Sequence, residues 1–321
     1  MHGSVDVPTA LAIGIDVGGT KMAAGLVDAD GQILHRLRAP TPARDPEQIV
    51  RVTAGIVETL RRHAPASVVG VGLAVPGQYD RHDGVFVRIA NLALRGFPFR
   101  ERLTDAIDLP IEIENDTNAA AYGEWSGGSG RGCQDFAFVA IGTGIGAGIV
   151  LDGHLLRGAH GSAGEIGHTV VEKDGPRCRC GNRGCLELFA SGGALAARAA
   201  DAASQHPSSM LAAWKREGRA LNAGDLFAAS AHGDDVSQSI VRDAVHYLAV
   251  GLNNLIELFD PERLAVGGGL SQIGDSLFDR LRQAVRDQRP GSPDVSPRIV
   301  PATLGEDAGI IGAAAAARRA S

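Results

Sequence analysis

One histidine and three cysteines occur close together in the middle of the chain, in a pattern typical of a metal site. The pattern is H-x9-C-x-C-x4-C, and its members are His168, Cys178, Cys180 and Cys185. Thiolates and an imidazole at short loop spacing are the ligands of a closed, tetrahedral zinc site. We therefore expect a structural zinc ion, which would also fix two neighbouring carboxylates, Glu165 and Glu187.

The alternative interpretation of this cluster is a disulfide pair with a spare thiol. The fourth cysteine, Cys133, makes the count even. However, two cysteines separated by one residue cannot bridge without strain. The N-terminus resembles no signal peptide, so we expect a cytoplasmic protein, and cytoplasmic thiols stay reduced. The sequence therefore favours metal over a disulfide.

A glycine-rich segment near the N-terminus could bind phosphate. An apolar run of strand length ends in it, and its candidate residues are Asp16, Gly18, Gly19, Thr20 and Lys21. Glycines at a strand–strand turn leave amide N–H groups free to point at an anion, and Thr20 and Lys21 add a hydroxyl and a positive charge. Asp16 could hold Mg²⁺ directly or through its waters. The alternative is a hairpin turn in which glycine serves only the geometry.

Two further glycine clusters follow later apolar runs. Residues 142–148 alternate four glycines with Thr143, Ile145 and Ala147, and the phosphate-binding candidates are Gly142, Thr143 and Gly144. The triplet Gly267, Gly268 and Gly269 could let an adenine or ribose lie against backbone. Either cluster could also be simple turn chemistry. The first two glycine segments together suit a pair of hairpins that grip one polyphosphate.

A third kind of chemistry is indicated at Asn115 and Asp116, which lie between a short apolar run and a helical segment. Loops at strand ends place reactive groups in α/β folds. Asp116 could accept the proton of an attacking hydroxyl, as in phosphoryl transfer. It could also be only the N-cap of the following helix, which is the commoner use of aspartate there.

Composition narrows the class of protein. The chain has 321 residues, of which 44% are hydrophobic and 21% charged, and its net charge is −6. The length allows two domains with their own cores. The acidic balance argues against a nucleic-acid partner, which would require a basic surface. No apolar run approaches the length of a membrane span.

Two stretches of the chain share one pattern of elements, which predicts an internal duplication. Strands are expected at 11–16, 22–27 and 32–38, and again at 138–141, 149–151 and 154–156, although the second copy has no counterpart of Asp16. Each three-stranded meander leads into alternating helices and strands, with helices at 46–63, 100–106, 116–125, 236–259 and 307–317. Residues 200–209 are expected to be a surface excursion. This pattern predicts two similar α/β lobes with a cleft between them.

The motifs together resemble the ROK family of sugar kinases and repressors, within the actin-like ATPase superfamily. The resemblance extends from Ile13 to about Ala317. It rests on I-G-I-D-V-G-G-T-K, E-N-D-T-N-A-A-A, G-T-G-I-G-A-G-I-V, G-E-I-G-H, C-R-C-G-N-R-G-C-L-E and G-E-D-A-G-I-I-G-A-A. It implies an α/β fold of two actin-like (ribonuclease H-like) lobes with an interlobe cleft.

The resemblance also implies roles for individual residues. Asp116 matches the base that takes the proton from the primary hydroxyl of the sugar. The positions that match sugar contacts or their supports are Gly77, Asn91, Asn115, Glu165, His168 and Glu187. The residue before Asn91 is often proline in the family and is Ala90 here, so this loop is expected to be less rigid. The metal cluster matches the family's zinc ligands, and the usual donor is MgATP.

By the same resemblance we expect phosphorylation of the 6-hydroxyl of a hexose, and the cysteine block looks most like the bacterial glucokinase branch. N-acetylglucosamine, N-acetylmannosamine, mannose and fructose stay open as substrates, and polyphosphate as the donor. The alternative of another class is a non-catalytic, sugar-responsive regulator. The family's repressors have a helix-turn-helix ahead of the sugar domain, for which the residues before the first strand leave no room.

The expected domains are a smaller N-terminal lobe over residues 9–122 and a larger C-terminal lobe over 123–304 that holds the zinc loop. A C-terminal helix over 305–320 is expected to pack back on the first lobe. The resemblance further implies a homodimer or a dimer of dimers.

Overall fold

The structure, a computed structural model, describes residues 10–293 and 298–320. The chain forms two compact units, the first built from residues 1–132, 148–163 and 303–321 and the second from 133–147 and 164–302. The sequence analysis places a boundary after residue 122, whereas helix α3 (Asp116–Gly127) stays whole and belongs to the first unit. The first unit also includes residues 148–163, and it is slightly the larger of the two.

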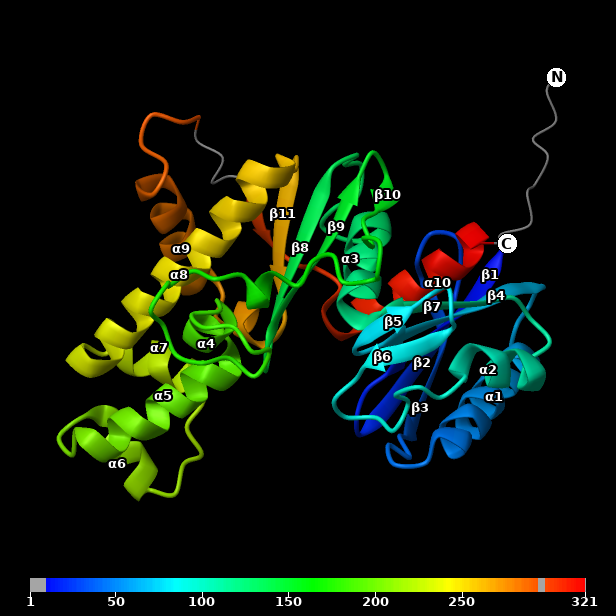
Figure 1. Cartoon of the computed structure of the whole chain (residues 1–321), viewed down its shortest axis with the longest axis horizontal. Coiled ribbons are helices and arrows are strands. Elements are labelled where there is room, and N and C mark those ends of the chain that lie inside the picture. Colours follow the sequence, from blue (N-terminus) through cyan, green and yellow to red (C-terminus); the bar gives the residue numbers. More distant parts are fainter. Residues whose placement is uncertain (1–9, 294–297, 321) are drawn as a thin grey trace. The chain divides into compact units, whose positions relative to one another are not determined.

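The first unit contains a five-stranded sheet in the order β3-β2-β1-β4-β7 (Figure 1). Its strands are β1 (Leu11–Val17), β2 (Lys21–Val27), β3 (Ile33–Pro40), β4 (Val68–Val75) and β7 (Ile111–Asn115). The first three strands pair antiparallel, and β4 and β7 then pair parallel to β1. The carboxyl ends of β1 and β7 therefore lie at one edge of the sheet, and Asp16 and Asn115 lie at these ends.

The second five-stranded sheet has the order β10-β9-β8-β11-β12. Its strands are β8 (Phe136–Ile141), β9 (Ile145–Leu151), β10 (His154–Leu155), β11 (Arg263–Gly267) and β12 (Ile299–Pro301). If β8 is matched to β1, the order of the two sheets is the same. An internal duplication of the kind predicted from the sequence requires this agreement.

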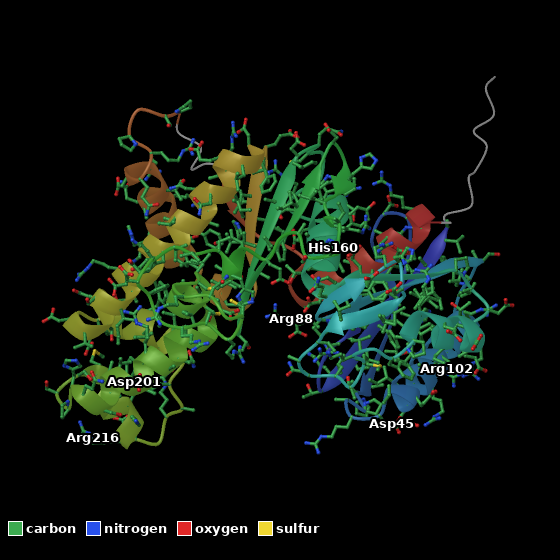
Figure 2. All side chains as sticks on the ribbon, in the orientation of Figure 1. Asp45, Arg88, Arg102, His160, Asp201 and Arg216 are labelled. Carbon is green, nitrogen blue, oxygen red and sulfur yellow. The ribbon has the colours of Figure 1, made fainter. Side chains whose placement is uncertain are left out.

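Helices cover both faces of the first sheet. On one face lie α1 (Pro46–Arg62) and α2 (Phe99–Ala106), whose buried side chains belong to the same hydrophobic core as Ile13 and Ile15 of β1. Helix α1 begins after Asp45, labelled in Figure 2, whose carboxylate accepts a hydrogen bond from the backbone N–H of Gln48 at 2.9 Å. An aspartate cap followed by proline at the first helical position is a strong start signal for a helix.

The other face of this sheet is covered by α10 (Ala308–Ala320), which also packs along α3 (Figure 1). The strands have glycine where the helix lies on them. A Cβ added at Gly14 would overlap the backbone carbonyl of Ile310, and one added at Gly72 would overlap that of Ala313. Glycine thus allows the helix backbone to rest directly on the strand backbone.

The second unit is mainly helical. Its helices are α4 (Glu187–Ala190), α5 (Gly192–Gln205), α6 (Met210–Arg216), α7 (Ala223–Ala231), α8 (Asp235–Phe259) and α9 (Asp275–Asp287). The sequence-based expectation of a surface excursion at 200–209 is wrong, because residues 200–205 form the last turns of α5. Ser191 caps this helix, and buried Leu195 and Ala199 hold it against the core.

Short elements complete the fold. They are the strands β5 (Gln78–Asp80) and β6 (Val85–Arg88) and the 3₁₀ turns η1 (Ile166–His168), η2 (Gly269–Ile273) and η4 (Gly305–Asp307). Among residues 10–293 and 298–320, no helix combines the length and apolar character that crossing a membrane requires.

Candidate active site

The candidate site residues fall into two groups, one in each unit. In the first unit, the turn between β1 and β2 is closed by a hydrogen bond from the N–H of Gly18 to the carbonyl of Lys21 at 3.0 Å. The Thr41 hydroxyl donates to the carbonyl of Gly18 at 2.7 Å. A Cβ added at Gly19 would lie 3.3 Å from that of Asn91, so two predicted site residues are neighbours.

Asp16 ends β1 beside this turn and is partly buried. Burial raises its pKa to about 6, the charge of Asp116 adds to the rise, Lys21 opposes it, and Glu306 adds a little more. The start of α10 lies against this carboxylate, since a Cβ added at Gly309 would be 3.2 Å from Asp16 Oδ2. A carboxylate with a raised pKa beside another acid is the setting in which a divalent cation is held well.

The turn that begins α3 settles which residue caps the helix. Asn115 is the N-cap: its Oδ1 accepts from the backbone N–H groups of Thr117 at 3.0 Å and Asn118 at 3.1 Å. Its Nδ2 donates to the carbonyl of Gly77 at 3.1 Å. Asp116 is therefore the first helical residue and not the cap, which removes the alternative interpretation of Asp116 raised by the sequence.

Asp116 lies in the first turn of α3 and is partly buried. Burial raises the pKa of its carboxyl, and hydrogen bonds from Thr117 oppose the rise. The backbone N–H of Thr117 donates to Asp116 Oδ1 at 2.8 Å, which fixes the orientation of the carboxylate. A fixed carboxylate with a raised pKa is a stronger base than a solvated one, as general base catalysis requires.

A cavity with a volume of about 930 Å³ lies in the second unit. Three predicted nucleotide-site residues line it: Gly142, Thr143 and Gly269. Gly267 and Gly268 do not. An added Cβ would meet the ring of Phe138 at the first position and the carbonyl of Ile141 at the second, so these two glycines allow close packing behind the cavity.

Much of the cavity wall is formed by residues that were not predicted from the sequence. Gly192 and Gly193 begin α5 and line the cavity, and the N–H of Gly192 donates to the carbonyl of Gly142 at 2.8 Å. The N-terminus of this 14-residue helix therefore faces the glycine segment. A helix N-terminus favours phosphate. The available signal was the Ser-Gly-Gly run from Ser191, a cap residue followed by two glycines.

The opposite wall comes from three more elements that sequence reasoning did not connect to the site. Its residues are Asn222, Ala223, Gly224, Phe227, Ala228, Ala231, Leu270, Gln272, Ile273 and Ser276. Most of them are apolar or small. A mainly apolar cavity lined by a few polar groups suits a flat heterocycle joined to a phosphate chain.

Two predicted sugar-binding acids lie near the glycine segment in the second unit. Glu187 Oε2 accepts from the backbone N–H of Ile145 at 3.3 Å, and a Cβ added at Gly144 would overlap its carboxylate. Glycine at 144 thus leaves room for this acid. Glu165 is exposed and immediately precedes η1, whose last residue is His168.

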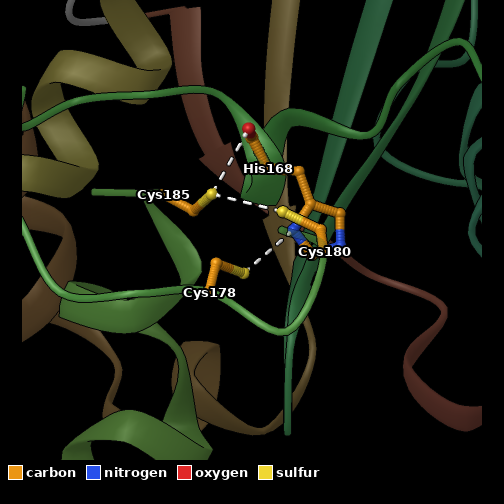
Figure 3. Close-up of side chains that lie close together, drawn as sticks. All are labelled: His168, Cys178, Cys180 and Cys185. Atoms are coloured by element: carbon orange, nitrogen blue, oxygen red, sulfur yellow. Dashed lines mark hydrogen bonds between the residues drawn. The ribbon is translucent and has the colours of Figure 1, made fainter. Parts of the chain in front are cut away.

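The four predicted metal ligands come together in the same unit, with their side chains pointing toward one another (Figure 3). Their ligand atoms all lie within 4.8 Å of one another. His168 Nδ1 is 3.7 Å from Cys178 Sγ, and the sulfurs of Cys180 and Cys185 are 3.6 Å apart. Zinc–sulfur bonds of about 2.3 Å place tetrahedral ligands about 3.7 Å apart. The donor set and its spacing therefore fit zinc.

None of the four cysteines, all of which lie in the described part of the chain, forms a disulfide. Burial, followed by the neighbouring thiols, raises the pKa of Cys185 to about 12. A bound divalent cation would deprotonate such a thiol outright. The ring of His168 presents Nδ1 to the cluster, which leaves Nε2 for another partner.

A family model described as the ROK family matches residues 12–320 of this chain. A glucokinase of Streptomyces coelicolor is 37% identical over 314 residues, which is 96% of this chain and 98% of that protein. The alignment is thus close to full length in both proteins.

Solved structures agree with the sequence match. A ROK family glucokinase from Streptomyces griseus, in complex with glucose and AMPPNP, is 35% identical and has a TM-score of 0.80; the match covers 97% of this chain and 100% of that one. A ROK hexokinase from Thermus thermophilus is 33% identical with a TM-score of 0.83, over 97% and 98% of the two chains. The mixed α/β fold predicted from the sequence is confirmed by these neighbours.

Proposed function

The chain belongs to the ROK family, and from this membership we propose that it is an ATP-dependent hexose kinase that phosphorylates the 6-hydroxyl of glucose. The observation that supports it best is the pair Asp16 and Asp116, brought close enough in the first unit for one charge to raise the pKa of the other. Nearly full-length similarity to curated glucokinases supports the choice of sugar.

Asp116 is the proposed general base. Its raised pKa makes it able to accept the proton of the attacking hydroxyl as the oxygen bonds to phosphorus. Asn115, Gly77 and Asn91 lie in the same unit, the first two joined by a hydrogen bond, and are proposed to hold the sugar beside this base. Glu165, Glu187 and the free ring nitrogen of His168 are the proposed acceptors and donors for other sugar hydroxyls.

Asp16 is the residue proposed to hold Mg²⁺, with Lys21 and the amide of Gly19 proposed to face the phosphates, since the N–H of Gly18 already closes the turn. When bound, the cation neutralises charge on the transferred phosphoryl group. The nucleotide is proposed to occupy the cavity lined by Gly142, Thr143 and Gly269. Its volume of about 930 Å³ is ample for a nucleoside triphosphate.

Zinc is proposed to hold the loop from His168 to Cys185. Glu165 is three residues before the first ligand and Glu187 two residues after the last, so both acids would be fixed by one ion. The spacing of the ligand atoms fits this role. A closed structural zinc site usually holds a loop in place, and here it would thereby position the two acids.

The test is ADP release from MgATP with a panel of glucose, N-acetylglucosamine, N-acetylmannosamine, mannose and fructose, using zinc-replete protein. We expect glucose to give the highest kcat/KM. A larger value for an amino sugar would replace glucose with that substrate. Polyphosphate in place of ATP tests the donor. No turnover with any sugar or donor, together with measurable sugar binding, would support the regulator instead.

The family likeness also supports a cytoplasmic location and a homodimer, both of which stay predictions. Light scattering on a sizing column measures the second directly. A mass of twice the 33.2 kDa chain is expected.

A further inference from the structure

A network of charged side chains lies in the first unit next to the turn that carries Asn115 and Asp116. Its members are Arg81, Glu112, Glu114 and Arg157. The side chain of Glu114 is only 5% exposed and that of Arg157 33%. Carboxylates buried to this degree are retained only when paired.

Glu114 is the centre of the network because its two oxygens face different partners. Oε2 accepts from Arg157 Nε at 2.6 Å and lies 3.5 Å from Arg81 Nη1. Oε1 accepts from the backbone N–H of Asn115 at 3.1 Å and from Asn118 Nδ2 at 3.3 Å. One carboxylate thus joins two guanidinium groups to the cap and first turn of α3.

The arginines are themselves anchored. Arg81 pairs with Glu112 and donates to the carbonyl of Ile113 at 3.0 Å, so it is fixed along β7. Arg157 comes from residues 148–163, a segment that belongs to the first unit while the chain on either side of it belongs to the second. Its carbonyl accepts from the N–H of Ala163 at 3.1 Å, which closes the end of that segment.

We propose that Arg157 and Glu114 are positioning residues for phosphoryl transfer, an inference that rests on the proposed function. Arg157 holds the carboxylate of Glu114, and Glu114 holds the N–H of Asn115 and the amide of Asn118. The N-cap geometry of Asn115 then sets the direction of Asp116. Neither positioning residue needs to touch the sugar or the nucleotide.

Loss of the Arg157–Glu114 ion pair should disturb the turn at Asn115. Removing the Arg157 guanidinium leaves a buried carboxylate with one charged partner fewer, so Glu114 is expected to change its hydrogen bonds or accept a proton. Either change loosens the N–H of Asn115. Because a misplacement of about 1 Å at a reacting group can cost 100-fold in rate, turnover should fall more than sugar binding.

The experiment compares Arg157→Gln, Glu114→Gln and the double variant in the full-length protein. Each single variant is expected to lower kcat about 10–100-fold with the KM for glucose changed less than about threefold. The double variant should match the singles, since residues that act through one contact are not additive. Arg157→Lys keeps a positive charge and should recover part of the loss.

The matched control is Arg102→Gln. Arg102, labelled in Figure 2, lies on α2 and pairs with Glu47 of α1 at 3.0 Å. The side chains of Arg102 and Glu47 are far more exposed than that of Glu114, at 43% and 41%. This control removes one guanidinium and its exposed ion pairs, with Glu47 and with Asp105, from the same unit and should leave kcat and KM unchanged.

Hydrogen–deuterium exchange of the peptide 111–127 gives a readout that does not depend on catalysis. Arg157→Gln should accelerate exchange there, with a melting temperature close to that of the wild type, and Arg102→Gln should not. Normal kcat in Arg157→Gln, or unchanged exchange in this peptide, would overturn the proposal. Absence of turnover by the wild-type protein would count against the proposed function alone, because hydrogen–deuterium exchange would still show whether Arg157 holds the start of α3 in place.

Discussion

Asp16 is a carboxylate whose surroundings disfavour its charge at neutral pH. Its pKa is raised from 3.8 to about 6, chiefly by burial and then by Asp116. Since the unfolded chain has the ordinary pKa, the folded state binds the proton more tightly. The contribution of Asp16 to stability is therefore fully present below about pH 4 and is lost as the pH rises through about 6.

Asp16→Asn should consequently stabilise the protein without ligands while abolishing turnover. At pH 7 we expect the free energy of unfolding to rise by about 2 kcal/mol, because asparagine resembles the protonated acid. At pH 4 the two proteins should be nearly equal. Urea unfolding at both pH values, in the absence of divalent cations, measures the difference. A variant less stable than the wild type at pH 7 would show that folding does not raise the pKa of Asp16.

The position of the candidate base could be predicted from residue types, but its role at the helix start could not. The run Glu114–Asn118 identifies the place where a strand gives way to a helix, but asparagine and aspartate are both good caps. Only the structure shows that the side chain of Asn115 accepts hydrogen bonds from the N–H groups of Thr117 and Asn118. The raised pKa of Asp116 was equally out of reach, since it comes from burial by parts of the chain distant in sequence.

At the scale of elements, the packing of α10 depends on glycine. A Cβ added at Gly312 would overlap the backbone carbonyl of Ala119 in α3. At Gly55, in the middle of α1, an added Cβ meets nothing within 4 Å. These two helical glycines therefore form a matched pair, since the same substitution has opposite consequences in packing.

Gly312→Ala should destabilise the protein by about 1–3 kcal/mol through overpacking. Gly55→Ala should stabilise it by about 0.5–1 kcal/mol, because alanine loses less conformational freedom in a helix. Thermal unfolding of the two variants beside the wild type is the measurement. If both shifted the melting temperature in one direction, the close contact between α3 and α10 would be in doubt.

The zinc loop is a second element that can be tested separately. Cys178→Ala should lose zinc and raise the KM for glucose about tenfold or more, with a smaller effect on the KM for MgATP. The cation is expected to fix Glu165 and Glu187 rather than the cavity beside Gly142. Cys133→Ala is the control, since this buried cysteine is not in the cluster. Metal analysis and steady-state kinetics on both variants test this role of zinc. A zinc-free Cys178→Ala protein with a normal KM for glucose would argue that zinc does not position the two acids.

Strongly patterned elements were predictable, and weakly patterned ones were not. The strands of both meanders and the long helix α8 follow clear apolar periodicities, and the structure has strands and a helix there, although β9 begins at Ile145, inside the glycine segment 142–148. Helices α5 and α7 are built largely from alanine, glycine and serine, which give little contrast between faces. Since these helices supply much of the 930 Å³ cavity wall, that part of the candidate site was missed as well.

At the scale of the whole molecule, two sheets of one strand order hold different chemistry. The first unit holds the acids Asp16 and Asp116. The second holds the cavity, the metal cluster and Glu187.

Asp116 is the proposed base for transfer of phosphate from ATP to the 6-hydroxyl of glucose. The most direct measurement compares wild type and Asp116→Asn, with phosphorus NMR of the product, glucose binding by calorimetry and 6-deoxyglucose as a control. We predict glucose 6-phosphate from the wild type and a loss of about 100–10,000-fold in kcat for the variant, with glucose affinity preserved. 6-Deoxyglucose should bind but accept no phosphate. Near wild-type turnover by Asp116→Asn, or phosphate on another hydroxyl, would contradict the account.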